Sequence, residues 1–178
     1  MNEFSYYMPT EVLFGRDCVI QQGARLKELG SHALIVTGRS SAGNGALGDV
    51  LAALEANGQT ATVFDRVMPN PTVACVREGV ALLRAAGADF IVAAGGGSPM
   101  DAAKAIATLA VQDRPDGEIF AGGYAAEALP MAHIPTTAGT GSEVTPYAIL
   151  TNDEKETKTS ITSPAMFPRL AFLDGKYM

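Results

Sequence analysis

Short apolar runs alternate with helical patterns along most of this chain of 178 residues. Runs such as HALIVTG (32–38) and DFIVAAGGG (89–97) are continuously apolar and end in glycine, as strands buried on both faces do. Stretches with helical spacing follow them, and several of these end at a glycine, a common helix stop. Strands alternating with helices predict a Rossmann-like, doubly wound α/β domain: a mostly parallel sheet with helices on both faces.

The pattern places each element within definite limits. Strands are expected at 11–15, 32–38, 60–65, 89–97 (strand plus turn) and 130–135. Helices are expected at 19–30, 45–58, 71–87 and 99–111. Two short segments, near 146–151 and 157–161, would form a small β-hairpin near the C-terminus. A length of 178 residues suits one well-packed domain.

Composition and charge exclude several classes of function. The net charge is -6 and the 13 Lys and Arg are scattered, so no basic stripe is available for a nucleic acid. The N-terminus lacks the features of a signal peptide, and no apolar run is long enough for a membrane span. Cys18 and Cys75 stand in unrelated contexts, which favours two buried thiols over a disulfide or a metal pair. We therefore expect a cytoplasmic protein that binds neither nucleic acid nor membrane.

The first informative loop is AAGGGSPMDAAKAIA (93–107), which joins an apolar strand to a helix. Glycines at 95–97 let the backbone turn sharply and let an anion approach its N–H groups. Ser98 is a favoured N-cap and Pro99 suits the first helical position, with Asp101 at capping-box spacing. A helix N-terminus aimed at such a loop predicts a site for phosphate or pyrophosphate.

This loop matches neither of two well-known phosphate motifs. No G-K-[ST] closes it as in a Walker A motif, and Met100 stands where G-x-G-x-x-G needs its third glycine. A capped turn with no ligand would explain the pattern equally well. Lys104 adds a cation one turn beyond Asp101 on the same helix face, which favours the anion site.

A second loop of similar chemistry, PTTAGTGSEVT (135–145), follows the next predicted strand. It carries hydroxyls around two glycines, at Thr136, Thr137, Thr140, Ser142 and Thr145. Hydroxyls and exposed amides suit the phosphates, riboses and carboxamide of a dinucleotide. A polar loop that is merely solvated at the sheet edge is the alternative. Two such loops would cradle one extended ligand more naturally than two unrelated ones.

GGGSPMDAAKAIA and PTTAGTGSEVTPYAIL resemble the signature blocks of the iron-dependent (group III) alcohol dehydrogenase family, whose fold is shared with dehydroquinate synthase. The resemblance extends to FSYYMPTEVLFG, VMPNPTVACVREGV and TNDEKETKTSITSPAMFPRLAFLD, and so covers essentially the whole chain. It implies that residues 1–178 are the NAD(P)-binding half of a homodimeric enzyme acting on a small alcohol or aldehyde. The family's helical half, which holds a divalent Fe or Zn, would lie outside this chain.

The resemblance also assigns individual residues to parts of the cofactor. It implies a pyrophosphate site at Gly96, Gly97 and Ser98, with Asp101 shaping that loop. It implies phosphate and nicotinamide contacts from Thr136, Thr137, Thr140, Val144 and Thr145. Lys158 would reach a ribose, although it lies in a charged turn where a lysine can be merely solvated, and Asn70 would lie near the adenosine. Such fixed donors suit an anionic ligand.

Two departures from the family pattern matter. Gly38 stands where NAD-using relatives often carry an aspartate, and it is followed by Arg39, Ser40 and Ser41. Without that carboxylate a 2′-phosphate is not repelled, so we expect NADP(H) to be preferred over NAD(H).

The second departure is that the family's metal ligands, an aspartate and three histidines, do not fall within these residues. His32 and His133 each lack a second ligand at metal spacing, so we interpret both as structural. We therefore expect no metal ligand and no catalytic residue in this chain, and no activity from the chain alone.

Two functional hypotheses follow. The first is the cofactor-binding half of a metal-dependent NAD(P)-linked alcohol or aldehyde oxidoreductase. The second is a dinucleotide-binding module without catalysis of its own, either a sensor or an inert truncation product. A sugar-phosphate cyclase of related fold is a weaker third possibility, since the threonine-rich second loop favours the dehydrogenase.

Overall fold

A parallel sheet forms the centre of the molecule. The computed structural model describes residues 3–38, 43–152 and 155–178. Within these residues, six parallel strands are ordered β1-β8-β5-β4-β2-β3. Their bounds are β1 (Glu11–Phe14), β2 (His32–Thr37), β3 (Thr60–Phe64), β4 (Phe90–Gly95), β5 (Met131–Pro135) and β8 (Leu170–Leu173). Strands β6 (Tyr147–Asn152) and β7 (Thr157–Thr162) form a separate antiparallel hairpin, as predicted.

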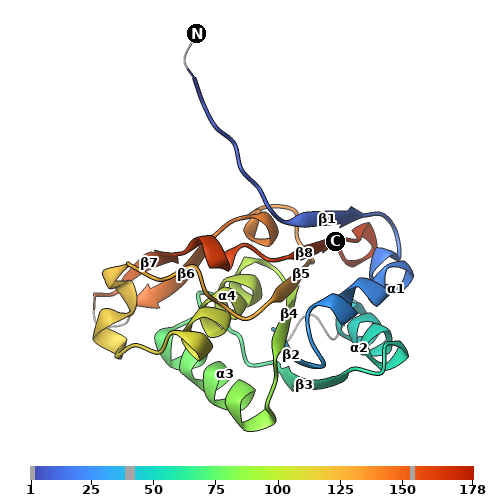
Figure 1. Cartoon of the computed structure of the whole chain (residues 1–178), viewed down its shortest axis with the longest axis horizontal. Coiled ribbons are helices and arrows are strands. Elements are labelled where there is room, and N and C mark those ends of the chain that lie inside the picture. The colour runs from blue at the N-terminus through green and yellow to red at the C-terminus, as the bar shows by residue number, and fades with distance from the viewer. Residues whose placement is uncertain (1–2, 39–42, 153–154) are drawn as a thin grey trace.

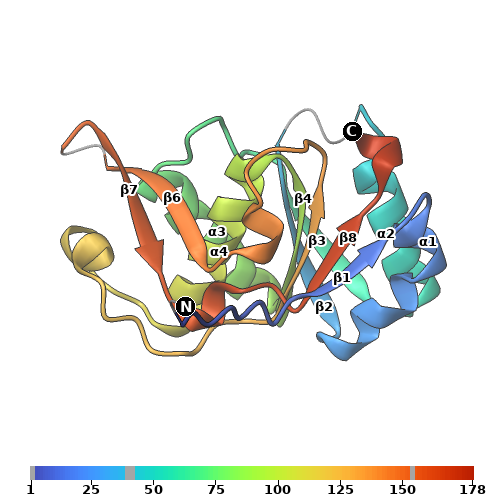
Figure 2. The ribbon, with the colours of Figure 1, turned by 90° about the horizontal axis from the view of Figure 1, so that it is seen from above.

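Helices cover both faces of this sheet. Helices α1 (Cys18–Gln21) and α2 (Ala46–Ala56) lie on one face, and α3 (Val73–Ala86) and α4 (Gly97–Val111) lie on the other (Figure 1). Figure 2 shows the β6–β7 hairpin as a further layer, on the far side of α3 and α4 from the sheet. Short 3₁₀ helices are η1 (Gly23–Glu28), η2 (Asp116–Ala121), η3 (Ser142–Val144), η4 (Pro164–Met166) and η5 (Gly175–Tyr177). Of the helices described, none is both long and apolar enough to span a membrane.

Alternate residues of each central strand belong to different hydrophobic cores. In β4, Ile91 and Ala93 belong to the core shared with α3 and α4. Phe90, Val92 and Ala94 belong to the core shared with α1 and α2. Because side chains of a strand point alternately to its two faces, a strand covered on both sides must be apolar throughout. The doubly wound α/β fold predicted from the continuous apolar runs is confirmed.

The strand order fixes where a ligand can bind. The chain runs outward from β2 to β3 and then returns to β4 on the other side of β2. There, Val36 of β2 pairs with Ala93 of β4. The direction of winding therefore reverses between β2 and β4. In open α/β sheets ligands bind outside the carboxyl ends of the strands at such a reversal. The loops after β2 and β4 are placed there.

The helix predicted at 19–30 is divided in the structure. Helix α1 ends at Gln21, and the chain continues as the tighter η1 from Gly23. A Cβ on Gly23 would lie 2.7 Å from Cβ of Ala53 in α2, so the two backbones approach closely here. Asn57 Nδ2 also donates to the Gly23 carbonyl at 2.8 Å. Packing against α2 thus overrides the single helical pattern.

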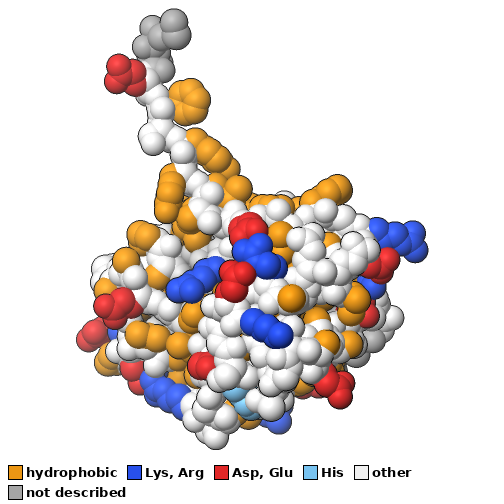
Figure 3. Space-filling model, turned by 45° about the vertical axis from the view of Figure 1, so that its right-hand side comes forward, with side chains coloured by type: hydrophobic (Ala, Val, Ile, Leu, Met, Phe, Trp, Pro, Cys, Tyr) orange, Lys and Arg blue, Asp and Glu red, His pale blue; other side chains and the backbone are white. Residues whose placement is uncertain are grey.

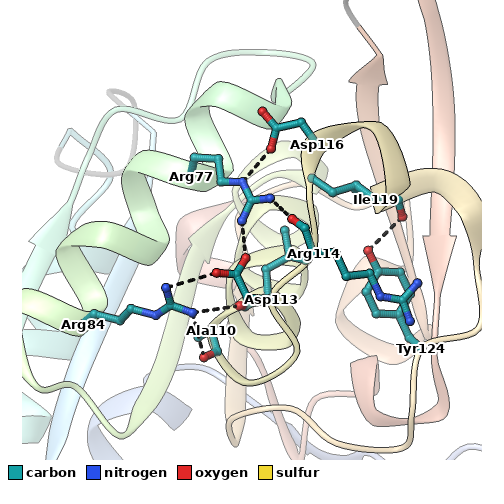
Figure 4. A network of polar contacts seen from close by, with 9 residues as sticks. Arg77, Arg84, Ala110, Asp113, Arg114, Asp116, Ile119 and Tyr124 are labelled. Carbon is teal, nitrogen blue, oxygen red and sulfur yellow. Dashed lines mark hydrogen bonds and ion pairs between the residues drawn. The ribbon is translucent and has the colours of Figure 1, made fainter.

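Strand β8 and the short 3₁₀ helices η2 to η5 were not predicted. Strand β8 is only four residues long, and its pairing with β1 and β5 is what makes it a strand. The short helix η2 lies in the connection between α4 and β5. Figure 4 shows Arg77 of α3 reaching across to this connection. Arg77 Nε donates to Asp116 at 2.8 Å and its Nη1 to Asp113 at 2.5 Å, while Arg114 stacks 4.0 Å over the Tyr124 ring. Arg77 is more than 35 positions from both aspartates in sequence, so local patterns do not reveal the element.

The N-terminal segment extends away from the body of the molecule (Figure 3). Residues 3–10 belong to no helix or strand, and Phe4, Tyr6 and Tyr7 are largely exposed. The Tyr7 ring meets Phe167 edge-on, with ring centroids 6.3 Å apart. Large exposed apolar side chains grouped on one segment are typical of a surface that contacts another protein or domain.

The close packing at Gly23 predicts opposite effects for two glycine-to-alanine changes. Gly23→Ala is expected to lower the free energy of unfolding by about 1–3 kcal/mol, because the alanine of α2 has no side-chain torsion with which to yield. Gly48→Ala, at an exposed position of α2 with nothing within 4 Å of the new Cβ, is expected to raise it by about 1 kcal/mol through helix propensity. Urea unfolding followed by circular dichroism measures both, and equal effects of the two changes would contradict this packing.

Candidate functional site

A hollow of about 410 Å³ opens at the reversal point of the sheet. Gly38, directly after β2, lines it together with residues 96–99, which follow β4. Val67, Met68 and Pro69 from the β3–α3 connection complete the wall. The predicted positions Gly38, Gly96, Gly97 and Ser98 are therefore brought together from two strands.

A second hollow, of about 240 Å³, shares Gly97 and Ser98 with the first. Its other walls come from α4, the second loop, the residues just before α3, and the hairpin. It is lined by Asn70, Pro71, Gly97, Ser98, Asp101, Thr140, Ile149, Leu150, Thr151 and Lys158. The shared residues make the two hollows neighbours, so one extended ligand can reach from Gly38 to Lys158. Hollows of about 440 and 540 Å³ also exist, but neither is lined by the glycine loop.

Helix α4 begins at Gly97, one residue before Ser98, which was predicted to be the N-cap. Gly96, with extended backbone, is the N-cap and Gly97 is the first helical residue, so Ser98 and Pro99 lie inside the first turn. Ser98 Oγ instead accepts a hydrogen bond from the Asn70 N–H at 3.3 Å. The predicted Ser98 cap is therefore wrong, and the anion site stays a prediction: the first N–H groups of an α-helix have no partners within the helix, and residues 96–99 line the hollow.

The second loop lies directly on the first. Thr137 Oγ1 is 3.3 Å from the point that a Cβ of Gly96 would occupy. Thr140 Cγ2 is 2.8 Å from the corresponding point of Gly97, a distance that real Cβ atoms do not tolerate. The close approach of Thr140 therefore favours a glycine at 97.

Asp101 and Lys104 hold the second loop, and the Asp101 carboxylate does not cap the helix. Asp101 Oδ1 accepts from Ser142 Oγ at 2.7 Å, and its Oδ2 accepts from the Ile149 N–H at 3.2 Å. Lys104 Nζ donates to Ser142 Oγ and to the Tyr147 carbonyl, both at 2.8 Å. The capping box predicted at Asp101 is wrong, because tertiary partners occupy its carboxylate.

Burial governs the ionisation of this group of side chains. It lowers the pKa of Lys104 to about 8, although the Asp101 and Glu143 carboxylates act in the opposite direction. It also raises the pKa of Asp101, against the Ser142 hydrogen bond and the charge of Lys104. The pKa of the fully buried His133 is held well below its usual value, first by burial and then by the nearby ammonium of Lys104. His133 is therefore neutral at physiological pH.

The remaining predicted residues fall into three groups. Thr136 directly follows β5, and its N–H donates to the carbonyl of Gly95 in the neighbouring β4 at 2.9 Å. Val144 ends η3, and Thr145 Oγ1 accepts from Lys104 Nζ at 3.4 Å. Arg39 and Ser40 lie outside the described residues.

The two histidines have structural surroundings. His32 Nε2 lies 2.9 Å from Thr62 Oγ1 and its Nδ1 lies 2.8 Å from Thr60 Oγ1, on the neighbouring strand. His133 lies inside β5 and is buried. Across the described ranges, no three His, Cys, Asp or Glu side chains gather in a way that could hold a metal ion. The thiols of Cys18 and Cys75 are free.

Several lining residues were not singled out from the sequence. Val67, Met68 and Pro69 come from the stretch VMPNPT, whose proline content signals a turn but not a wall of a site. Ile149 and Thr151 come from the hairpin, which is held at the site by α4 and by hydrogen bonds from Thr151 to the Asn70 and Pro71 carbonyls. No short-range pattern carries that information.

The chain matches a family model described as iron-containing alcohol dehydrogenase over residues 9–175. It is 36% identical over 179 aligned residues to a protein of Clostridium acetobutylicum named NADH-dependent butanol dehydrogenase B, covering 99% of this chain and 46% of that protein.

Solved structures agree with this match. An iron-containing alcohol dehydrogenase of Thermotoga maritima superposes with a TM-score of 0.87 at 42% identity, over 98% of this chain and 48% of the other. A sulfoacetaldehyde reductase of Bifidobacterium kashiwanohense in complex with NAD⁺ gives 0.86 at 32% identity, over 99% and 47%. The chain spans just under half the length of these relatives.

The buried ammonium predicts a definite pH dependence of stability. Because the folded-state pKa of Lys104, about 8, lies below its usual 10.5, the unfolded chain binds more protons in that interval. The free energy of unfolding therefore increases as the pH rises from 8 to 10.5. This gain is lost again as the pH falls through 8. Relative to Lys104→Met, the wild type should gain about 1–2 kcal/mol between pH 8.5 and 10. Urea unfolding of both proteins measures this difference, and a difference independent of pH would contradict the burial of a charged lysine.

Proposed function

The chain belongs to the iron-containing alcohol dehydrogenase family, and from this premise we propose that it is the part that binds a nicotinamide dinucleotide and positions it for hydride transfer to or from a small alcohol or aldehyde. One observation carries this proposal. The glycine loop after β4 and the threonine loop after β5 meet at the N-terminus of α4, with Thr140 seated on Gly97. A helix N-terminus beside paired polar loops suits a pyrophosphate with groups extending both ways.

The donors of this region fit such a ligand. The first N–H groups of α4 are available for the pyrophosphate, and Ser98, Thr140 and Lys158 line the same hollow. At the other end Gly38 leaves room beside residues 96–99 for the adenosine part. The relative named for NADH dependence and the relative solved with NAD⁺ support a dinucleotide as the ligand.

In this proposal the residues of this chain bind and orient the nicotinamide cofactor, and they do not activate the substrate oxygen. A bound nicotinamide supplies the carbon that gains or loses the hydride, and the loop containing Val144 and Thr145 would set the face it presents. In the complete enzyme a divalent Fe or Zn would polarise the alcohol oxygen, held by residues outside this chain. The described residues contain no group of side chains suited to that role.

The second candidate function is a dinucleotide-binding module without catalysis of its own. It needs only the cofactor site that the two hollows form. The two functions share the cofactor site and differ in whether an adjoining metal-binding half completes it.

Free Cys18 and Cys75 thiols fit a reducing cytoplasm, and the exposed aromatic N-terminal segment fits a contact with a second copy in a homodimer.

Binding by the isolated chain tests the cofactor site. Titration calorimetry is expected to give saturable heats with NAD or NADP for the wild type and none for Gly97→Val at millimolar cofactor. Valine at 97 would displace Thr140 and place a branched side chain where the phosphate meets the backbone. Gly117→Val is the matched control, because Gly117 lies in η2, outside both loops, with nothing within 4 Å of its new Cβ.

Thermal unfolding of the three proteins separates binding from folding. Gly97→Val should stay folded, since Thr140 is exposed and belongs to a loop. Absence of any heat from the wild type, or normal binding by Gly97→Val, would overturn the placement of the phosphate.

Cofactor preference is the finer part of the proposal: NADP(H) over NAD(H). Gly38 lacks the carboxylate that bonds ribose hydroxyls and repels a 2′-phosphate, and Arg39 and Ser40 follow it in sequence. A charge-assisted hydrogen bond from Arg39 would contribute about 1.5–3 kcal/mol, or roughly tenfold or more in the ratio of dissociation constants. The wild type is therefore expected to bind NADP more tightly than NAD, and Gly38→Asp to reverse the order.

A control is needed because a Cβ at 38 would lie 3.1 Å from the Val67 carbonyl oxygen. Gly38→Ala introduces that Cβ without the charge, so it should weaken both cofactors alike and leave their ratio unchanged. Tighter binding of NAD by the wild type, or an unchanged ratio in Gly38→Asp, would refute the preference.

A further inference from the structure

Lys104 is an unusual residue for the middle of a packed helix. Its side chain is 0% exposed, and its neighbours along α4 from Ala102 to Leu109 are all buried. A lysine is almost never fully buried unless its ammonium group is paired. The reason for a cation at this position must therefore lie in what it contacts.

The hydrogen bonds of the ammonium group all go to the stretch from Ser142 to Tyr147, which follows β5. Nζ donates to Ser142 Oγ at 2.8 Å, to Thr145 Oγ1 at 3.4 Å and to the Tyr147 carbonyl at 2.8 Å. These acceptors use the three donors that an ammonium possesses. They span the end of the second loop and the first residue of β6.

The same contacts connect with the phosphate end of α4. Ser142 accepts from Lys104 and donates to Asp101 Oδ1, while its N–H donates to Thr140 Oγ1 at 3.3 Å. Thr140 is the residue seated on Gly97, and Asp101 lines the hollow that Gly97 and Ser98 share. A continuous set of hydrogen bonds thus runs from the buried lysine to the predicted pyrophosphate site.

We propose that Lys104 is a positioning residue for the cofactor, which fixes the second loop over the start of α4 and adds a positive charge beneath the bound phosphates. The proposal rests on the dinucleotide function given above. Seven residues of helix separate Lys104 from Gly97, roughly 10 Å along the axis. At that separation inside a protein, one unit charge changes the affinity for an anion by roughly three- to tenfold.

The ionisable groups that face Lys104 come from several elements. They are Asp101 on α4 itself, Glu143 on η3 and the neutral His133 on β5. Both carboxylates favour the charged lysine, whereas burial lowers its pKa to about 8. An anion bound at the start of α4 would raise that pKa again, so cofactor binding near pH 8.5 would draw a proton onto Lys104.

Titration calorimetry provides the test, with whichever of NAD and NADP binds more tightly. At pH 8.5, repeated in buffers of different ionisation enthalpy, the wild type is expected to take up a measurable fraction of a proton. Lys104→Met should bind the cofactor at least threefold more weakly and should lose that fraction. Ser142→Ala breaks the connection to Asp101 but keeps the charge, so it should bind more weakly with proton uptake retained.

Ile106→Val or Ile106→Ala, chosen to match the loss of thermal stability in Lys104→Met, controls for general destabilisation of α4. Ile106 is buried against Gly79 of α3, so binding and proton uptake should stay at wild-type levels. Equal affinity and equal proton uptake in the wild type and Lys104→Met would overturn the proposal. If Lys104→Met does not fold, unchanged affinity in Ser142→Ala would overturn it. Absence of binding by the wild type would instead refute the dinucleotide site itself.

Discussion

The contact between Thr140 and the backbone of Gly97 is the one on which the whole site depends. It brings the loops after β4 and β5 together, and it is possible only because residue 97 has no Cβ. The parallel sheet makes this meeting unavoidable, since the carboxyl ends of neighbouring strands open at the same edge. The free N–H groups of α4 then face a space walled by both loops.

A buried polar group stabilises this arrangement at some cost. Removing a lysine from water is expensive, and the cost is offset only if each of its donors finds an acceptor. Lys104 finds its acceptors in the loop that must be fixed, and Asp101 in turn holds Ser142 and the start of the hairpin. The charge is therefore placed where it can order the site, and a methionine of similar size could not replace it in that role.

Much of the fold follows from the sequence because strand and helix periods are local properties. Continuous apolar runs gave β2 and β4, and glycine stops gave the ends of α2 and α3. Tertiary packing decided the remainder. Gly23 divides a predicted helix because Ala53 lies against it, and β8 exists because β1 and β5 flank it.

The candidate site shows the same division between local and distant information. Gly97, Ser98 and Asp101 could be singled out because a glycine loop before a helix has a recognisable pattern. Their individual partners could not be: Asp101 bonds residues more than 40 positions away, and Ser98 accepts from Asn70 instead of capping its helix. The walls contributed by Met68 and Ile149 depend on how the hairpin and the β3–α3 connection fold back.

Hydrogen exchange measured residue by residue, with and without saturating NADP or NAD, examines the shared site most directly. If the two loops cradle one ligand, the amides at 96–98 and at 136–145 should gain protection together, with the same dependence on cofactor concentration. The amides around the separate hollow between α3 and η2 should not change. Protection of one loop alone, or protection centred on that other hollow, would contradict a single dinucleotide site at the start of α4.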